Sequence, residues 1–240
     1  MNNKLIFIIG ILILGLIFYF FGRGIWVPIS QKFSGKKTTD DIVKIYGERA
    51  KSAIQPYFTQ SGIAYPPKNI MLLAMKQEQK LELWASNGND PFSFIHTYKI
   101  QKLSGILGPK LREGDRQVPE GIYKIIGLNP NSSYHLSMKI NYPNEFDLAH
   151  AKQEGRTEPG TNIFIHGKAV SIGCLAMGDK TIEELFLLVN DVGIENTEVV
   201  IAPYDPRLKA LQFDEKTMPV WTQDLYENIT AKFDQFKHRS

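Results

Sequence analysis

The residues best suited to chemistry are one cysteine and one histidine that lie close together in the chain. Cys174 is the only cysteine among the 240 residues, and it follows His166 by eight positions within the segment IFIHGKAVSIGCLAM. A thiol attacks a carbonyl carbon as the thiolate, and a neighbouring imidazole can remove its proton and later protonate a leaving amine. The pair therefore predicts covalent acyl transfer, with Cys174 as the nucleophile and His166 as the general base.

Small residues beside this pair fit the same chemistry. Gly173 has no Cβ, so a substrate carbonyl can approach the N–H groups of Gly173 and Cys174, which would form an oxyanion hole. Ser171 can orient the imidazole or a substrate group. Gly167, directly after the histidine, is placed with Ser171 and Gly173 among the residues expected to support the reaction centre.

Other interpretations of these residues stay open at this point. A lone cysteine is often a buried and inert thiol, and a lone histidine next to an apolar run is often structural. Cys174, His166, His135 and His150 lack the local spacing of zinc ligands. Ser171 lacks the G-x-S-x-G pattern of a serine nucleophile. No metal and no cofactor are predicted.

The elements that would position these residues are mostly strands. Apolar, β-branched and aromatic segments predict strands over residues 70–75, 81–85, 92–100, 121–126, 134–140, 162–165 and 199–202. The first two flank the polar residues 76–80, which predicts a hairpin. Helical spacing predicts helices over residues 41–57 and 225–236, and a third that starts with a capping box of Thr181 and Glu184. Pro56 is expected to end or distort the first helix. Residues 104–119 and 141–160 are expected to be loops. The fold class predicted is α+β, mainly β with flanking helices.

The N-terminus carries an uncharged apolar run of a different kind. Residues 5–21 read LIFIIGILILGLIFYFF, and at about 1.5 Å per residue they reach roughly 25 Å, near the lower limit for a membrane span. The run is longer than a typical signal-peptide core, and no A-x-A-like site follows it. It predicts an uncleaved signal anchor, with a cleaved signal as the alternative.

The overall composition excludes some partners. The net charge is +3, with 43% hydrophobic and 22% charged residues, and no basic stripe interleaved with aromatic residues is present. This balance is typical of a globular protein and does not favour nucleic acid as a partner.

The order of several motifs resembles one known family. The segment around His166 and Cys174 is similar to the His-Gly and Ser-x-Gly-Cys motifs of the L,D-transpeptidase catalytic domain family of peptidoglycan enzymes, in its compact-motif proteobacterial murein subgroup. Further segments fit in the same order, namely LELW (81–84), SG (104–105), GPK (108–110), EGD (113–115), VPEGIY (118–123) and YPN (142–144). The resemblance covers roughly residues 41–203.

This resemblance implies a function and a place of action. It implies transfer of peptidoglycan peptide stems through a Cys174 thioester, with His166 as base and Ser171 and Gly173 in support. Water as the acceptor would instead give a carboxypeptidase, or an amidase that releases a wall-linked lipoprotein. A non-catalytic wall-binding module is the alternative of another class. Positive charges flank both ends of the apolar run, and more follow it than precede it, which by itself favours a cytoplasmic domain. The resemblance implies the periplasmic face of the inner membrane instead.

The sequence departs from the family pattern near the nucleophile. Ala176 stands where many members have an arginine that helps to hold the substrate, so recognition must come from elsewhere. His135 matches a subgroup pattern and either lines the cleft or is structural. Lys110, Arg112 and Arg116 form a basic cluster that either attracts an acidic stem or is a solvated loop.

These predictions divide the chain into four parts. Residues 1–27 are expected to be the anchor helix, residues 28–66 a tether and helix, residues 67–205 the catalytic domain, and residues 206–240 a C-terminal helical extension.

Overall fold

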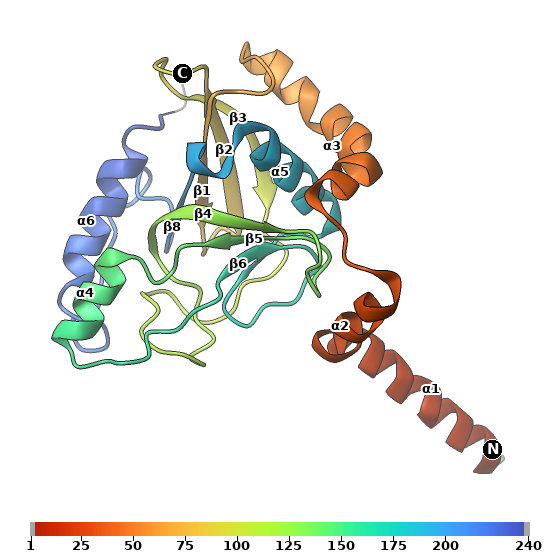
Figure 1. The fold of residues 1–240 in the computed structure, drawn as a ribbon. Coiled ribbons are helices and arrows are strands. Elements are labelled where there is room, and N and C mark those ends of the chain that lie inside the picture. Colours follow the sequence, from red (N-terminus) through yellow and green to blue (C-terminus); the bar gives the residue numbers. More distant parts are fainter. Residues whose placement is uncertain (1–2, 238–240) are drawn as a thin grey trace.

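The computed structural model describes residues 3–237, which fold into a mixed α and β structure around one sheet (Figure 1). The helices are α1 (Asn3–Phe21), α2 (Arg23–Ser34), α3 (Thr39–Ser61), α4 (Glu145–Gln153), α5 (Asp179–Val192) and α6 (Thr222–Phe233), with a short 3-10 turn at Ile194–Asn196. The strands are β1 (Asn69–Met75), β2 (Lys80–Ser86), β3 (Ser93–Lys99), β4 (Gly121–Asn129), β5 (Ser137–Ile140), β6 (Phe164–His166), β7 (Leu175–Ala176) and β8 (Thr197–Ala202).

The sheet has the order β3-β2-β1-β8-β4-β5-β6-β7. The predicted hairpin of residues 70–75 and 81–85 is confirmed as the antiparallel pair β1 and β2. Two neighbouring pairs are parallel, β1 with β8 and β6 with β7. The first half of β4 pairs with β8, and its second half pairs with β5 after a register shift between Ile125 and Gly127. Such an irregularity bends a strand, so β4 carries the sheet from its large half into the small half that ends in β6 and β7.

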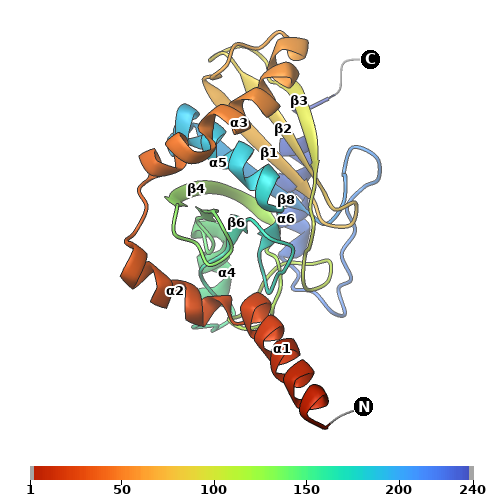
Figure 2. The ribbon, with the colours of Figure 1, turned by 90° about the vertical axis from the view of Figure 1, so that its right-hand side faces the viewer.

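Helices cover both faces of the large half of the sheet. Side chains alternate along β1, so Leu72 packs in the core under α3 and α5, whereas Leu73 packs in a second core under α6. Figures 1 and 2 show α6 on the side of the sheet opposite to α3 and α5. Because β1 is buried on both faces, its sequence is a continuous apolar run rather than an alternating one.

Helix α1 extends away from this core (Figure 2), whereas α2 is hydrogen-bonded to the turn between β4 and β5. The apolar side chains of α1 are mostly exposed. Among residues 3–237 no single helix is both long and apolar enough for a membrane span, and α1 and α2 pass that test only together, as a pair bent by 78°. The segment expected to be a tether is in part helical, because α2 continues to Ser34. On α2, the Arg23 side chain donates to the carbonyl of Ser133 (2.7 Å), in the turn between β4 and β5.

Three helix predictions were wrong. Helix α3 passes through Pro56 and ends at Ser61, because Ile54 and Phe58 on either side are fully buried and hold both segments on the sheet. Helix α5 starts at Asp179 without a side-chain cap, and the carboxylate of Glu184 accepts from the Tyr98 hydroxyl (3.0 Å) instead of forming the predicted box with Thr181.

The third error concerns the expected loop of residues 141–160, which contains α4. Asn144 caps this helix, and Asn144 and Asp147 bond to each other's backbone N–H groups in a capping box. The capping pattern is present in the sequence. The amphipathic pattern is weak because only Asp147 and Ala151 of this helix are buried.

Candidate active site

Strand pairing brings the predicted nucleophile and base to one face of the sheet. Strands β6 and β7 run parallel, with Ile165 beside Leu175 and His166 beside Ala176. Ala176 and His166 share one face, and Leu175 and Ile165 pack into the core beneath. Cys174 directly precedes β7, so the same alternation, continued by one residue, places it on the face of Ala176 and His166. Cys174 and His166 are therefore diagonal neighbours across the two segments.

The imidazole of His166 is held in one tautomer. Its Nδ1 lies 2.6 Å from the carbonyl oxygen of Gly167, and a carbonyl only accepts, so Nδ1 carries the proton. Nε2 is then left with a lone pair. The Tyr134 ring packs on the imidazole at 4.9 Å between centroids. Burial lowers the pKa of His166 below its usual 6.5, against the opposite effect of the Gly167 carbonyl, so the ring is a neutral base at pH 7.

The thiol of Cys174 is protonated at rest. Burial raises its pKa above 9.0, although a backbone hydrogen bond from Phe164 and the positive charge of Lys110 act in the opposite direction. A thiol with a raised pKa beside an imidazole with a lowered pKa does not form a resting ion pair. For such a thiol to attack a carbonyl, its proton would have to pass to the base during the attack.

The backbone around the nucleophile is held by two serine hydroxyls. The N–H of Gly173 donates to Oγ of Ser104 (2.6 Å), and the N–H of Cys174 donates to Oγ of Ser171 (3.1 Å). The Ser171 hydroxyl donates to the Cys174 carbonyl (2.6 Å) and lies 3.2 Å from the Ser104 hydroxyl. The two amides predicted to form an oxyanion hole thus already have acceptors, and an oxyanion would have to displace them. Within residues 3–237, Ser171 makes no hydrogen bond to His166, so it organises the turn and not the imidazole.

Gly167 is needed for close packing behind the base. A Cβ at this position would lie 2.7 Å from the carbonyl oxygen of Tyr134 and 3.0 Å from the Cβ of His135. The Gly167 N–H donates to the carbonyl of Leu136 (3.1 Å). Only glycine allows the loop between β4 and β5 to pack this tightly against the residue whose carbonyl fixes the His166 tautomer.

His135 has a structural contact rather than an open position in the cleft. Its Nε2 lies 2.7 Å from a carboxylate oxygen of Glu183 on α5, and Glu183 also pairs with Arg49 on α3. These contacts support the structural alternative for His135. They also fasten the loop that presents Tyr134 to His166.

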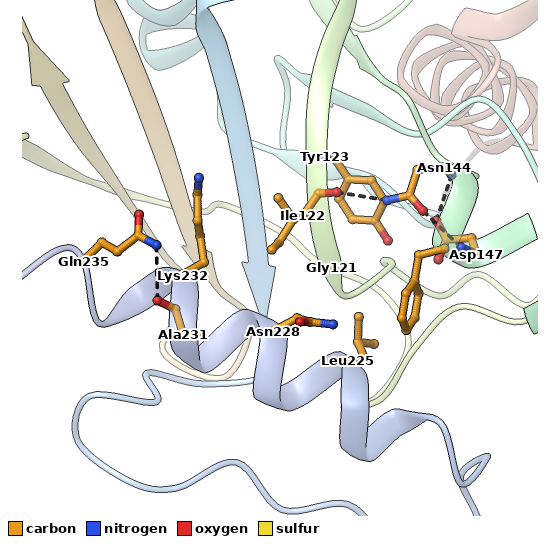
Figure 3. Close-up of a pocket in the computed structure, with 11 residues that line it drawn as sticks. Gly121, Ile122, Tyr123, Asn144, Asp147, Leu225, Asn228, Ala231, Lys232 and Gln235 are labelled. Atoms are coloured by element: carbon orange, nitrogen blue, oxygen red, sulfur yellow. Dashed lines mark hydrogen bonds between the residues drawn. The ribbon is translucent and has the colours of Figure 1, made fainter. Parts of the chain in front are cut away.

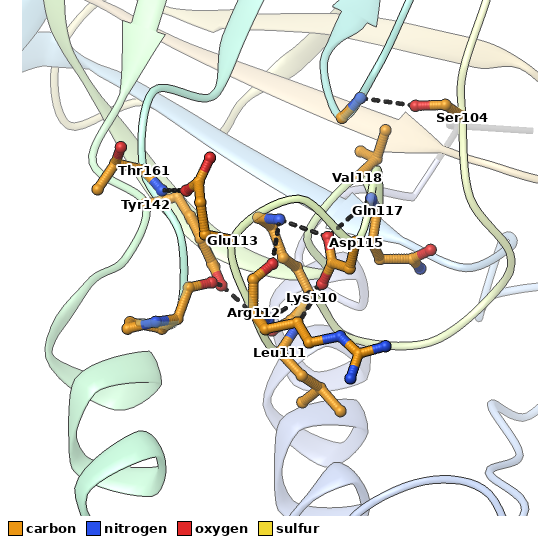
Figure 4. A network of polar contacts seen from close by, with 12 residues as sticks. Ser104, Lys110, Leu111, Arg112, Glu113, Asp115, Gln117, Val118, Tyr142 and Thr161 are labelled. Atoms are coloured by element: carbon orange, nitrogen blue, oxygen red, sulfur yellow. Dashed lines mark hydrogen bonds and ion pairs between the residues drawn. The ribbon is translucent and has the colours of Figure 1, made fainter. Parts of the chain in front are cut away.

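Residues 101–120, here called the strap, contact the nucleophile segment at Gly173 and Ala176. Figure 4 shows the polar contacts of the strap around Lys110 and Asp115. Ser104 reaches Gly173, and the Gln117 carbonyl lies 3.5 Å from where a Cβ of Gly173 would be. Within the strap, the ammonium of Lys110 is buried and pairs with Asp115. Lys110 is thus not available to attract a stem, whereas Arg112 and Arg116 are exposed.

Two contributors to the site were missed by the sequence analysis. Ser104 was noted only as part of a family motif in an expected loop, and Tyr134 only as the start of an expected strand. The strand β5 begins at Ser137, so Tyr134 lies in the preceding turn. No spacing rule connects either residue to His166 or Cys174, because each reaches the site through a side-chain contact from a distant loop or turn.

The remaining clusters and cavities lie elsewhere. Within the described part of the chain, no three histidine, cysteine or acidic side chains are grouped to hold a metal ion. The His150 ring stacks on Trp221 at 4.8 Å between centroids. A cavity of about 240 Å³ lies between α4, β4 and α6, and Tyr123, Phe146 and Leu225 are among the residues that line it (Figure 3). No residue of the nucleophile segment lines it.

Comparison with known proteins identifies the family of this domain. The family model of the L,D-transpeptidase catalytic domain, YkuD, matches residues 63–201. The chain belongs to the L,D-transpeptidase catalytic domain family. It is 32% identical over 176 residues to YafK of Escherichia coli strain K12, which is named as a candidate L,D-transpeptidase. That match covers 70% of this chain and 66% of YafK, slightly less than two thirds of its length.

Solved structures of lower identity were also found. A variant of the helical cell shape determining protein Pgp2 from Campylobacter jejuni aligns with a TM-score of 0.48 and 19% identity, over 72% of this L,D-transpeptidase-family chain and 55% of Pgp2. Bd1075 of Bdellovibrio bacteriovorus aligns with a TM-score of 0.41 and 23% identity, over 59% of this chain and 50% of Bd1075.

Proposed function

We propose that this chain is an acyltransferase that acts on peptidoglycan peptide stems through a thioester on Cys174. The observation that carries the proposal is the tautomer of His166. Its Nδ1 proton is committed to the Gly167 carbonyl at 2.6 Å, so the free Nε2 lone pair belongs to a neutral base on the same face as the thiol. Membership of the L,D-transpeptidase family supplies the substrate class.

The reaction runs in two steps on these residues. Nε2 of His166 takes the Sγ proton as Sγ bonds to the carbonyl carbon after the L-centre of diaminopimelate in a tetrapeptide stem. When the tetrahedral intermediate collapses, the C–N bond breaks and the leaving D-amino acid receives the proton from His166. The side-chain amine of a second stem then attacks the thioester, forms the new amide and releases the Cys174 sulfur.

Water can replace the amine in the second step. The product is then a shortened stem. If the group that leaves in the first step is a lipoprotein linked to the wall, that lipoprotein is released. The chemistry of Cys174 is identical in both cases, so only the identity of the products shows whether an amine or water is the acceptor.

The test is incubation of the full chain with purified muropeptides and identification of products by mass. Cross-linked dimers are the expected product, and trimmed stems or freed lysine-linked peptide would mean hydrolysis. The matched control is the Cys174→Ser chain, which should leave the muropeptides unchanged. A folded parent chain that changes no muropeptide would contradict the proposal and favour a wall-binding module.

We also propose that the domain works on the periplasmic face of the inner membrane, with α1 as its anchor. The uncharged run of residues 5–21 and the cell-wall substrate support this placement. A reporter enzyme that is active only outside the cytoplasm, fused after residue 240, is expected to be active in intact cells. Activity only from a reporter that works in the cytoplasm would overturn this orientation.

A further inference from the structure

The strap contributes a lysine, Lys102, that pairs with Ala176 next to the candidate reaction centre. The side chain of Ala176 is only a methyl group. Lys102 and Ala176 form an isolated antiparallel bridge, in which Lys102 N donates to the Ala176 carbonyl (3.3 Å) and Ala176 N donates to the Lys102 carbonyl (3.1 Å). Ala176 in turn pairs with His166 on β6. The three residues therefore form one row across adjacent strands.

Residues that pair directly across strands share a face of the sheet. Lys102, Ala176 and His166 thus lie on the face that also carries Cys174. Adjacent strands are about 4.8 Å apart, so the backbone of Lys102 is roughly 10 Å from that of His166. Ala176 between them is fully buried and has a small side chain, so it places no long side chain between Lys102 and the thiol.

Lys102 differs from the lysines Lys110 and Lys168 near the site because its ammonium has no carboxylate partner in the described part of the chain. Lys110 is buried and pairs with Asp115, and Lys168 pairs with Asp179. Within residues 3–237, the side chain of Lys102 is exposed and makes no ion pair or hydrogen bond. An ammonium without a partner beside a reaction centre is available to an anionic group of the substrate.

The strap is fixed on both sides of this lysine, so the ammonium is presented from a rigid backbone. Gln101 N also donates to the Ala176 carbonyl (2.8 Å). Two residues after Lys102, the Ser104 hydroxyl accepts from the Gly173 N–H (2.6 Å). Such support reduces the ordering cost of binding a substrate group at Lys102.

We propose that Lys102 recognises the free carboxylate of the residue that leaves from the stem. This inference rests on the proposed function and names the substrate feature that the site selects. The terminal carboxylate lies one residue beyond the reacting carbonyl, roughly 3.8 Å along the chain. A stem whose carbonyl carbon meets the Cys174 sulfur, before the C–N bond breaks, can therefore place this carboxylate toward the row of Ala176 and Lys102. The site then prefers stems that end at the residue after the scissile bond.

The test measures binding and does not need turnover. The full chain carrying Cys174→Ser is titrated by calorimetry with the tetrapeptide stem that ends in D-alanine, and with the same peptide ending in D-alaninamide. The acid is expected to bind about tenfold more tightly than the amide. Lys102→Met should remove this preference and Lys102→Arg should keep it. Lys152→Met, which removes an exposed lysine on α4, should leave it unchanged.

Four results would overturn the assignment. They are equal affinities for acid and amide, a preference that survives Lys102→Met, a preference that disappears with Arg116→Gln but not with Lys102→Met, and no binding of either peptide. The proposed reaction is judged separately by turnover of the parent chain. A carboxylate preference at Lys102 in a chain that turns over no stem would leave the recognition standing and refute the reaction.

Discussion

Replacing His166 by alanine is expected to lower turnover of muropeptides by about 100- to 10,000-fold, the usual contribution of a general base. The thiol of Cys174 has its pKa raised by burial, so it loses its proton at neutral pH only with the help of the Nε2 lone pair. Cys174→Ala is expected to abolish turnover. The double variant should be no worse than Cys174→Ala, because the two residues act as one unit.

The pH dependence follows from the directions of the two pKa shifts. His166 accepts a proton only when it is neutral, so turnover should fall as the pH drops through its pKa, which lies below 6.5. Alkylation of Cys174 by iodoacetamide needs the thiolate, so in the His166→Ala chain it should rise only as the pH passes above 9.

The matched control is His96→Ala, which removes a half-buried histidine on β3 whose pKa burial also lowers. This variant should keep the parental turnover. A His166→Ala chain that turned over stems at the parental rate would contradict the assignment of the base.

Replacing Glu120 by alanine is expected to lower the free energy of unfolding by about 3–5 kcal/mol, because it leaves a buried ammonium without its counter-charge. One carboxylate oxygen of Glu120 bonds to Nζ of Lys76 (2.8 Å) and to the N–H of Gly108 (2.7 Å), and the other accepts from the Tyr226 hydroxyl (2.8 Å). Both Lys76 and Glu120 are almost fully buried. This network ties the strap to Lys76, which directly follows β1, and to α6, so turnover should fall as well.

Denaturation by urea at several pH values measures this effect. Burial lowers the pKa of Lys76, and Glu120 opposes that shift. Without Glu120, the pKa of Lys76 in the folded chain falls further below its pKa in the unfolded chain. The unfolded chain then binds more protons between these two pKa values, so the stability of the variant should recover as the pH rises.

Glu227→Ala on α6 removes an exposed carboxylate and should change stability by no more than about 0.5 kcal/mol. Equal losses in the free energy of unfolding for the Glu120→Ala and Glu227→Ala chains would show that the buried pair of Lys76 and Glu120 does not hold the strap.

Local patterns predicted most elements, and failed where distant contacts overrode them. The alternating and apolar runs of β1 and β2 predict their hairpin because burial on the sheet repeats along each strand. Pro56 should break a helix by its own chemistry, but the buried Ile54 and Phe58 keep α3 continuous. Helix α4 was missed because its cap pattern is local while its amphipathic signal is weak.

The sequence by itself determined the chemical identity of the site, because residue type and the order of family motifs are properties of the chain alone. It named Cys174 and His166, and it showed that Ala176 supplies no cation. Only the tertiary structure decided which groups meet them. The pairing of β6 with β7 sets which residues of one short segment face each other, and the pairing of Ala176 with Lys102 joins residues far apart in sequence. Contacts of this kind depend on strand register, which one-dimensional spacing does not encode.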